Sequence, residues 1–275
     1  MPKKSEIREK IQEYVLNNSP VFSKSEFLNS YPTINGDSLI TTLGRMTKEG
    51  IAFQPWRGIY VCFPQEKYGS EDVHLREYLN TIMINVGIQY YITMFDALQE
   101  LIPSYCKENT SEYQIMIDNP GMGGLLGKTS PRPRFLKNKL HPAPYVVSTK
   151  TKYGKLNIPT AELLGIDFIS YAHTIGGLQE SVNALKILSA KLDFKRLNAD
   201  IFEFRTAANI QRLGYIIENV LGMAEMAQPL HDLLDVRYNK VYARNLLASA
   251  LPATHTNINK RWQLDINVEL KNNRI

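Results

Sequence analysis

Cysteine is scarce in this sequence, which has only Cys62 and Cys106 among its 275 residues. Two cysteines cannot build a disulfide scaffold, and they nearly exclude a cysteine-based zinc site. The first residues, Met-Pro-Lys-Lys-Ser-Glu, also lack the apolar run of a signal peptide. We therefore expect the protein to work in the reducing cytoplasm.

Long apolar runs are lacking as well. The longest uncharged stretch extends from Tyr78 to Phe95, but polar residues such as Asn80, Asn85 and Gln89 interrupt it. Such residues are costly in hydrocarbon, so the stretch predicts a buried helix end followed by a strand, and no membrane contact.

The usual catalytic motifs are missing too. The five histidines are scattered, and no His-Glu-x-x-His pair or Gly-x-Ser-x-Gly elbow occurs. The segment Gly121–Thr129 ends in Gly-Lys-Thr, but its first glycine is misplaced for a phosphate-binding loop, and Pro131 and Pro133 prevent the required helix. Asp118 alone suggests a nuclease carboxylate. We expect no enzyme activity, no metal and no cofactor.

Positive charge, by contrast, is concentrated in one part of the chain. The net charge is +5, and the segment 128–155 contains eight basic residues and no acidic one. Such a block is either a solvated loop or strand face, or a phosphate-binding surface. The basic residues are Lys128, Arg132, Arg134, Lys137, Lys139, Lys150, Lys152 and Lys155.

The N-terminal residues have a helical pattern in three segments. Apolar residues recur at helical spacing over 5–17, with Ser5 as the cap, and a second helix is expected from Ser23 to Tyr31. Val21-Phe22 is expected to be a connector between them. Asp37 can cap a third helix that reaches Glu49, with Leu39, Leu43 and Met46 buried.

Two β-rich runs follow, at 51–53 and 59–63, around the turn Gln54–Gly58. Three helices and a hairpin in this order predict a winged helix-turn-helix over 1–68, in which the third helix enters the major groove of DNA. The expected DNA contacts are polar or cationic side chains. They are Ser38, Thr41, Thr42, Arg45, Lys48 and Arg57. Alternatively, this polar face serves protein–protein contact.

The remaining residues, 69–275, predict a larger mixed α/β domain with a C-terminal helical layer, so the fold class is α+β. Strands are expected at 113–117, 145–148 and 155–158. Helices are expected at 69–84, 93–101, 161–172, 178–191, 206–222 and 225–235. Phe202 and Phe204 lie in a connecting segment that can be extended.

Four segments resemble motifs of the AbiEi family, the antitoxins of AbiE-type (type IV) toxin–antitoxin systems. Residues 57–61 are similar to its Arg-Gly-Val/Ile-Tyr strand. Residues 160–167 resemble Thr-Pro-Glu-x-x-x-Leu-Asp, with Ala161 in place of the proline, and Gly176-Gly177-Leu178 follows. Residues 211–218 resemble Arg-Leu-Gly-Tyr-Leu-Leu-Glu, and 261–267 resemble Trp-x-Leu-x-x-Asn.

Physically, these motif residues are mostly core, with Asp167 and Arg212 as a candidate buried pair. The resemblance implies an N-terminal winged helix that binds inverted repeats in double-stranded operator DNA and represses its own operon. It also implies a C-terminal domain that counters a nucleotidyltransferase-like toxin without a stable complex, in phage defence. A ligand-sensing regulator and a metal-dependent nuclease remain alternatives.

Overall fold

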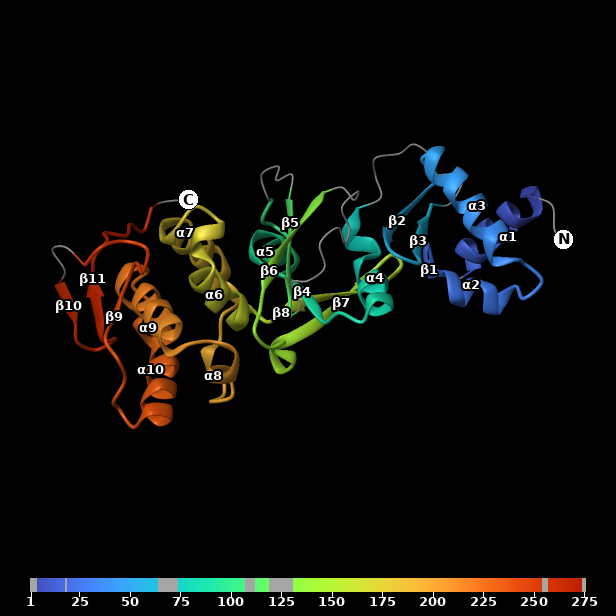
Figure 1. The fold of residues 1–275 in the computed structure, drawn as a ribbon. Coiled ribbons are helices and arrows are strands. Elements are labelled where there is room, and N and C mark those ends of the chain that lie inside the picture. The colour runs from blue at the N-terminus through green and yellow to red at the C-terminus, as the bar shows by residue number, and fades with distance from the viewer. Residues whose placement is uncertain are drawn as a thin grey trace. The chain divides into compact units, whose positions relative to one another are not determined.

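The computed structural model describes residues 4–17, 19–63, 74–106, 112–118, 131–253 and 257–273 (Figure 1). The chain divides into two compact units. Unit 1 comprises Met1–Tyr91, Asn109–Asn138 and Ser148–Asn157, and unit 2 comprises Ile92–Glu108, Lys139–Val147 and Ile158–Ile275. The domain border expected after residue 68 lies outside the described residues, so that division stays a prediction.

Unit 1 begins with the three expected helices, α1 (Lys4–Asn17), α2 (Lys24–Ser30) and α3 (Gly36–Lys48). They are accompanied by a sheet with the strand order β1-β3-β2, formed by β1 (Val21–Ser23), β2 (Ala52–Trp56) and β3 (Ile59–Cys62). Both pairings are antiparallel. The expected connector Val21-Phe22 is therefore a strand, because it pairs with Tyr60 and Val61.

The helix caps agree only in part with expectation. Ser23 caps α2 through a capping box, in which its hydroxyl accepts from the Glu26 N–H and Glu26 accepts from the Ser23 N–H. Ser5 lies inside α1 and does not precede it. Helix α3 is capped by Asn35, whose Oδ1 accepts from the Asp37 N–H at 2.8 Å, so the expected cap Asp37 lies in the first turn.

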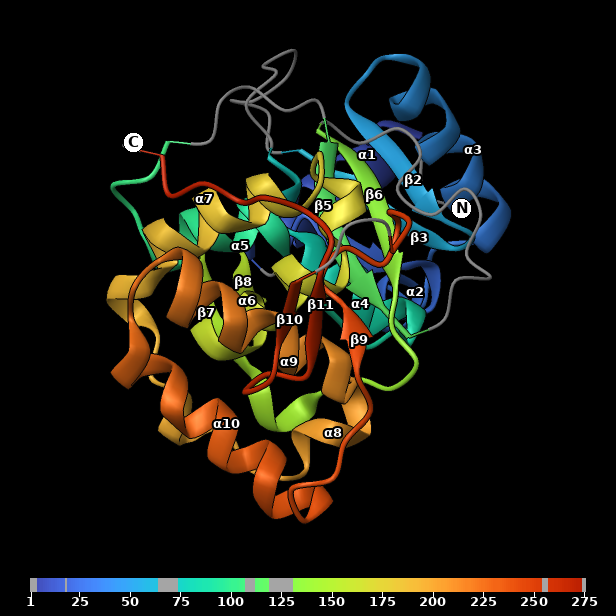
Figure 2. The same ribbon diagram turned by 90° about the vertical axis from the view of Figure 1, so that its left-hand side faces the viewer.

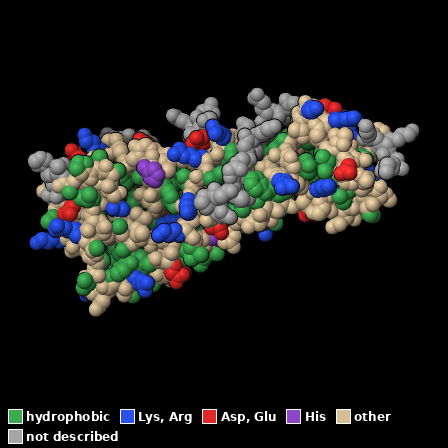
Figure 3. Space-filling model, viewed as in Figure 1, with side chains coloured by type: hydrophobic (Ala, Val, Ile, Leu, Met, Phe, Trp, Pro, Cys, Tyr) green, Lys and Arg blue, Asp and Glu red, His purple; other side chains and the backbone are tan. Residues whose placement is uncertain are grey.

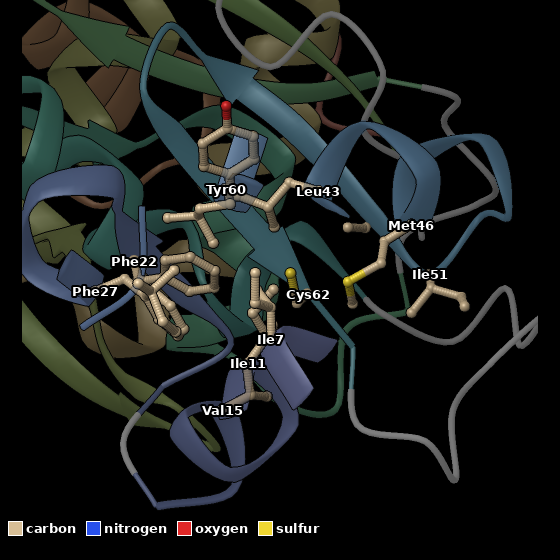
Figure 4. Close-up of a cluster of buried hydrophobic side chains, with 13 residues drawn as sticks. Ile7, Ile11, Val15, Phe22, Phe27, Leu43, Met46, Ile51, Tyr60 and Cys62 are labelled. Atoms are coloured by element: carbon tan, nitrogen blue, oxygen red, sulfur yellow. The ribbon is translucent and has the colours of Figure 1, made fainter. Parts of the chain in front are cut away.

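The helices and the sheet share one apolar core (Figure 4). Helix α1 contributes Ile7 and Ile11, and α3 contributes Leu39 and Leu43, all fully buried. Aromatic rings from α1, β1 and α2 fill the remaining space, with the Tyr14, Phe22 and Phe27 ring centroids 5.5 Å apart in each pair. This packing fixes which side of α3 remains outside.

Further along the chain, a 3-10 turn (Leu75–Glu77) and α4 (Leu79–Val86) lead into β4 (Tyr90–Ile92), as the uncharged stretch predicted. A second sheet has the order β4-β5-β6, from β5 (Glu112–Ile117) and β6 (Arg132–Lys137), which run parallel. A hairpin of β7 (Val146–Thr151) and β8 (Gly154–Pro159) follows. Strand β6 was not expected from the sequence.

The second unit is mainly helical, with α5 (Met94–Leu101), α6 (Ala161–Ser170), α7 (Leu178–Leu188), α9 (Ala207–Tyr215) and α10 (Ala224–Tyr238). Phe202 and Phe204, expected in a connecting segment, lie in the short helix α8 (Ile201–Phe204). Helix α9 continues into a π-helical turn, Ile216–Val220. The mixed α and β content expected from the sequence is confirmed.

A small sheet closes unit 2 in the strand order β10-β11-β9 and lies beside α9 in Figure 2. It consists of β9 (Asn245–Leu246), β10 (Asn257–Asn259) and β11 (Leu264–Ile266). Across the described part of the chain, no helix combines the length and apolar character needed to cross a membrane.

Candidate nucleic-acid interface

The exposed face of α3 is set by the residues that the helix buries. Leu39, Leu43 and Met46 are at most 1% exposed, as the helical spacing predicted. The opposite face of α3 is exposed to solvent, because none of the described helices and strands packs against it. Its exposed residues are Asp37, Ile40, Thr41, Gly44, Arg45 and Lys48.

Thr42 does not belong to this face, although it was expected to contact DNA. It is only 5% exposed, and its hydroxyl donates to the Ser38 carbonyl oxygen at 2.9 Å. Position 42 follows Leu39 by three residues and precedes Met46 by four, so it shares their buried side. Its hydroxyl is therefore used inside the helix.

The other expected α3 residues remain accessible to different degrees. Ser38 is half-buried and Thr41 is exposed, with the Thr41 hydroxyl donating to the Asp37 carbonyl oxygen at 2.8 Å. Arg45 and Lys48 are exposed, and neither forms an ion pair with any residue that the structure describes. These two cations are free to contact phosphates or guanine edges.

Two further α3 residues bear on the chemistry of this face. Ile40 is 43% exposed and was missed at the sequence level, although its methyl groups suit the apolar contact that thymine offers. Asp37 is exposed in the first turn, where the helix dipole favours a carboxylate. A phosphate would have to avoid Asp37, so contacts are expected nearer Thr41 and Arg45.

The hairpin β2–β3 presents its turn to solvent. Trp56 pairs with Ile59, which leaves Arg57 and Gly58 as a two-residue loop. Gly58 has a φ of 78°, a conformation that glycine adopts without strain, and its carbonyl oxygen accepts from the Lys24 N–H at 2.9 Å. Arg57 is thus exposed at the tip of a turn that the Gly58 carbonyl oxygen ties to the first residue of α2.

The basic block 128–155 is not one surface in the structure. Lys128 lies outside the described residues, and Lys139 belongs to unit 2 while the other members belong to unit 1. On β6, Arg132 is exposed, but Arg134 pairs with Glu112 at 3.2 Å. Lys137 is exposed on the opposite side of the strand from Arg132, because strand side chains alternate.

The remaining basic residues gather at the tip of the β7–β8 hairpin. Lys150, Lys152 and Lys155 are all exposed there. The Lys152 backbone N–H donates to the Glu77 carboxylate at 2.6 Å, and the Thr151 hydroxyl donates to the Glu77 carbonyl oxygen at 3.2 Å. On the face shown in Figure 3, Lys and Arg side chains form separate small groups.

In unit 2, Asp167 has a different partner from the expected Arg212. Arg205 donates to Asp167 from Nε at 3.0 Å and from Nη2, and both side chains are at most 3% exposed. The Thr93 hydroxyl donates to the second carboxylate oxygen at 3.1 Å. Arg212 instead donates to the Leu246 carbonyl oxygen at 2.9 Å. Arg205 lies in no motif and no periodic segment, so the sequence did not indicate it as the partner of Asp167.

Unit 2 also contains a cavity of about 560 Å³. It is bordered by the end of α6, the first turn of α7, α9 and the segments 247–251 and 268–270. Within the described ranges, no group of three or more His, Cys, Asp or Glu side chains is arranged to hold a metal ion. Asp118 follows β5, and the Gly121–Thr129 segment lies outside the described residues.

Residues 105–219 match the family model of the AbiEi antitoxin C-terminal domain. This match confirms the resemblance, and it includes two of the four motif segments, 160–167 and 211–218. The fold is similar to that of the RV2827C protein from Mycobacterium tuberculosis, with a TM-score of 0.61, 15% sequence identity, and coverage of 94% of this chain and 90% of that chain. At this identity the likeness concerns the fold alone. No curated protein matches the chain.

Proposed function

We propose that this chain, whose residues 105–219 match the family model of the AbiEi antitoxin C-terminal domain, is a DNA-binding antitoxin that represses its own operon. In this proposal the N-terminal segment is a winged helix-turn-helix that reads inverted repeats in double-stranded operator DNA. The C-terminal part counters a nucleotidyltransferase-like toxin without forming a stable complex with it. The protein acts in the cytoplasm, in phage defence.

The observation that carries the DNA-binding part is the uncovered face of α3. Helix α3 packs with α1 and the β1-β3-β2 sheet through its apolar side, while Arg45 and Lys48 project without an ion-pair partner among the described residues. In winged helix proteins the third helix enters the major groove, and the hairpin reaches the neighbouring backbone or minor groove. Arg57 is exposed at the hairpin turn and is proposed to make the second contact.

Each residue then has a distinct role in the proposal. Arg45 and Ile40 face base edges, where a guanidinium can read guanine and an aliphatic group can contact the thymine methyl. Thr41, Lys48 and Arg57 contact the phosphate backbone and fix the register of the protein on the duplex. Thr42 has no DNA role because it is buried.

A gel shift with the DNA upstream of the protein's own coding region, repeated across salt concentrations, tests this proposal. Specific binding is expected, with affinity falling as salt rises because phosphate contacts release counterions. Random DNA of equal length is the control, and specific sites typically bind about 10³-fold or more tightly than it. Equal affinity for both DNAs, or no shift, contradicts the repressor function.

The antitoxin part needs a separate test. The candidate toxin is a nucleotidyltransferase-like protein encoded beside this chain, and co-expression is expected to restore growth that the toxin alone arrests. Because no stable complex is proposed, affinity purification of the toxin from the same cells is expected to recover none of this chain. A variant lacking residues 105–219 but keeping the rest serves as the control that loses rescue.

The hairpin tip formed by Lys150, Lys152 and Lys155 is proposed as a second nucleic-acid contact. Its three cations are exposed, and hydrogen bonds from the Lys152 N–H and the Thr151 hydroxyl to Glu77 hold the tip in place. Charge-assisted contacts to phosphate need such exposed cations and no base recognition. The contact would raise affinity for all DNA sequences alike.

A ligand-sensing regulator is the second candidate function, and the cavity in unit 2 favours it. Its volume is within the range of small-molecule sites. The discriminating observation is a compound that changes the affinity of the full chain for its operator.

A further inference from the structure

The cavity of unit 2 has mainly apolar walls drawn from separate parts of the chain. The C-terminal end of α6 and the segment 247–251 supply two sides, and α7 and the chain after β11 supply the others. The larger apolar lining residues are Ile169, Leu178, Leu247, Leu251, Val268 and Leu270. A space of about 560 Å³ with such walls can hold a small organic molecule.

Two amide side chains hold the walls of this cavity in position. Asn267 accepts from the Ala248 N–H at 2.9 Å and donates to the Ala248 carbonyl oxygen at 2.9 Å. Gln179 pairs in the same way with the backbone of Lys271, at 2.9 Å and 2.8 Å. The segments on either side are therefore fixed by paired hydrogen bonds and form a preformed site.

One cation, Arg212, reaches the cavity from α9. Its Nε donates to the Leu246 carbonyl oxygen at 2.9 Å, and its Nη1 lies 3.4 Å from the Asn209 Oδ1. The Asn209 amide donates at 2.7 Å to the Ser170 hydroxyl, which orients Asn209 toward the guanidinium. The Arg212 Nη2 has no hydrogen-bond partner among the residues that the structure describes.

No carboxylate among the described residues forms an ion pair with Arg212. Burial lowers the pKa of this guanidinium, which reports the cost of removing a cation from water, although arginine stays protonated at every physiological pH. Glu269 is the acidic residue of the lining, but it is exposed, so water screens its charge. An anion bound inside the cavity would offset the free-energy cost of removing the Arg212 guanidinium from water.

We propose that this cavity binds a small organic anion, whose apolar body lies against the aliphatic walls and whose carboxylate, phosphate or sulfonate accepts from the Arg212 Nη2. A mainly apolar lining with a few placed polar groups is the usual composition of small-molecule sites. The proposal does not depend on DNA binding, so a gel shift on the same preparations tests the two separately.

A matched pair of fluorescent dyes tests both halves of the proposal with the full chain. The anion 8-anilinonaphthalene-1-sulfonate (ANS) and neutral N-phenyl-1-naphthylamine share one aromatic body and differ in the sulfonate. ANS is expected to bind saturably at one site per chain. Arg212→Gln is expected to weaken ANS about tenfold, the loss of one charged hydrogen bond, and to leave the neutral dye unchanged.

Three further variants complete the design. Ala250→Trp places a large ring at the exposed border of the cavity and is expected to weaken both dyes without touching Arg212. Arg196→Gln removes an arginine that is 71% exposed and outside the cavity, and should change neither dye. Arg212→Lys keeps the charge and should weaken ANS less than Arg212→Gln does.

Circular dichroism melting of each variant establishes that it is folded. If Arg212→Gln is unfolded, the other two variants test the proposal. Ala250→Trp must weaken the binding of both dyes, and Arg212→Lys must weaken the binding of ANS alone. The proposal is overturned if ANS shows no saturable site, if the Arg212 variants weaken both dyes equally, or if Ala250→Trp leaves both dyes bound.

Discussion

The indole of Trp262 fills the space that a side chain on Gly214 would occupy, because a Cβ built on Gly214 would lie 2.1 Å from two ring atoms. Gln211, one turn earlier on α9, donates to the Trp262 carbonyl oxygen at 3.0 Å, and the indole N–H donates to Glu218. Thus the motif segments 211–218 and 261–267 pack against each other and are joined by hydrogen bonds.

Gly214→Ala is expected to destabilise the protein by about 1–3 kcal/mol, since the fully buried ring of Trp262 must shift to admit a methyl group. Urea unfolding followed by circular dichroism measures this loss. Gly44→Ala on the exposed side of α3 is the matched control, because a Cβ there meets nothing within 4 Å. It should gain about 0.5–1 kcal/mol from helix propensity. A Gly214→Ala protein as stable as wild type contradicts the close approach.

The buried pair Asp167–Arg205 is expected to matter most when only one partner is removed. Asp167→Leu or Arg205→Met leaves an uncompensated buried charge and should cost about 3–5 kcal/mol of unfolding free energy. The double variant should lose less than the sum of the two single losses, because neither charge then remains. Denaturant titration of the four proteins gives this coupling, and strict additivity would show that the two side chains do not interact.

The sequence predicts helices and strands well where apolar residues recur at a regular spacing. It predicts them less well where pairing with a distant part of the chain forms the element. Strand β6 was missed because it begins inside the Pro/Gly-rich stretch 119–133, whose composition is typical of a loop. Pro133 fits β6 because that strand is at the edge of its sheet, where one N–H is not needed. Strand β1 was missed because three residues carry no detectable alternation, and only pairing with β3 makes them a strand.

The candidate site was predictable to the extent that it depends on helical spacing. The buried stripe of α3 correctly left Arg45 and Lys48 outside, and the same spacing applied to Thr42 would have placed it inside. The choice of Arg212 as the partner of Asp167 was wrong because Arg205 lies in a segment without periodicity. Only the folded chain brings Arg205 next to Asp167.

The two cysteines are expected to react at very different rates with a thiol reagent. Burial raises the pKa of the Cys62 thiol to about 12, and its side chain is only 1% exposed, so hardly any thiolate forms at pH 8. Cys106 is exposed. Native protein should therefore release one equivalent of chromophore from Ellman's reagent quickly, and a second only in denaturant. Cys106→Ser should abolish the fast phase, and a persistent fast phase contradicts the burial of Cys62.

Arg45→Ala and Arg57→Ala are each expected to weaken operator binding by about 1–3 kcal/mol. Arg45 is proposed to read a base, so its loss should also relax sequence preference, whereas loss of Arg57 should weaken binding to all sequences alike. Thr42→Ser should leave affinity unchanged because that hydroxyl is bound to the Ser38 carbonyl oxygen. Fluorescence anisotropy with operator and random DNA measures all three, with Arg196→Ala as the exposed control. If Arg45→Ala behaves like the control, α3 is not the reading helix.

Charge reversal at the hairpin tip provides the test of the second nucleic-acid contact. The triple variant Lys150→Glu, Lys152→Glu and Lys155→Glu removes three exposed cations, while the Lys152 backbone bond to Glu77 does not depend on its side chain. Affinity for operator and random DNA should fall by a similar factor. The slope of log affinity against log salt should also become shallower by about 1 for each phosphate that the variant no longer binds.

The control reverses three exposed cations of unit 2 instead, through Lys191→Glu, Lys195→Glu and Arg196→Glu. Both triple variants change the net charge by the same amount, so any effect of total charge on DNA affinity appears equally in both. A larger loss of affinity and a shallower salt slope in the hairpin variant alone assign phosphate contacts to β7–β8. Equal losses in the two variants, or an unchanged slope, would assign DNA affinity to α3 and the Arg57 turn and remove the hairpin tip from the interface.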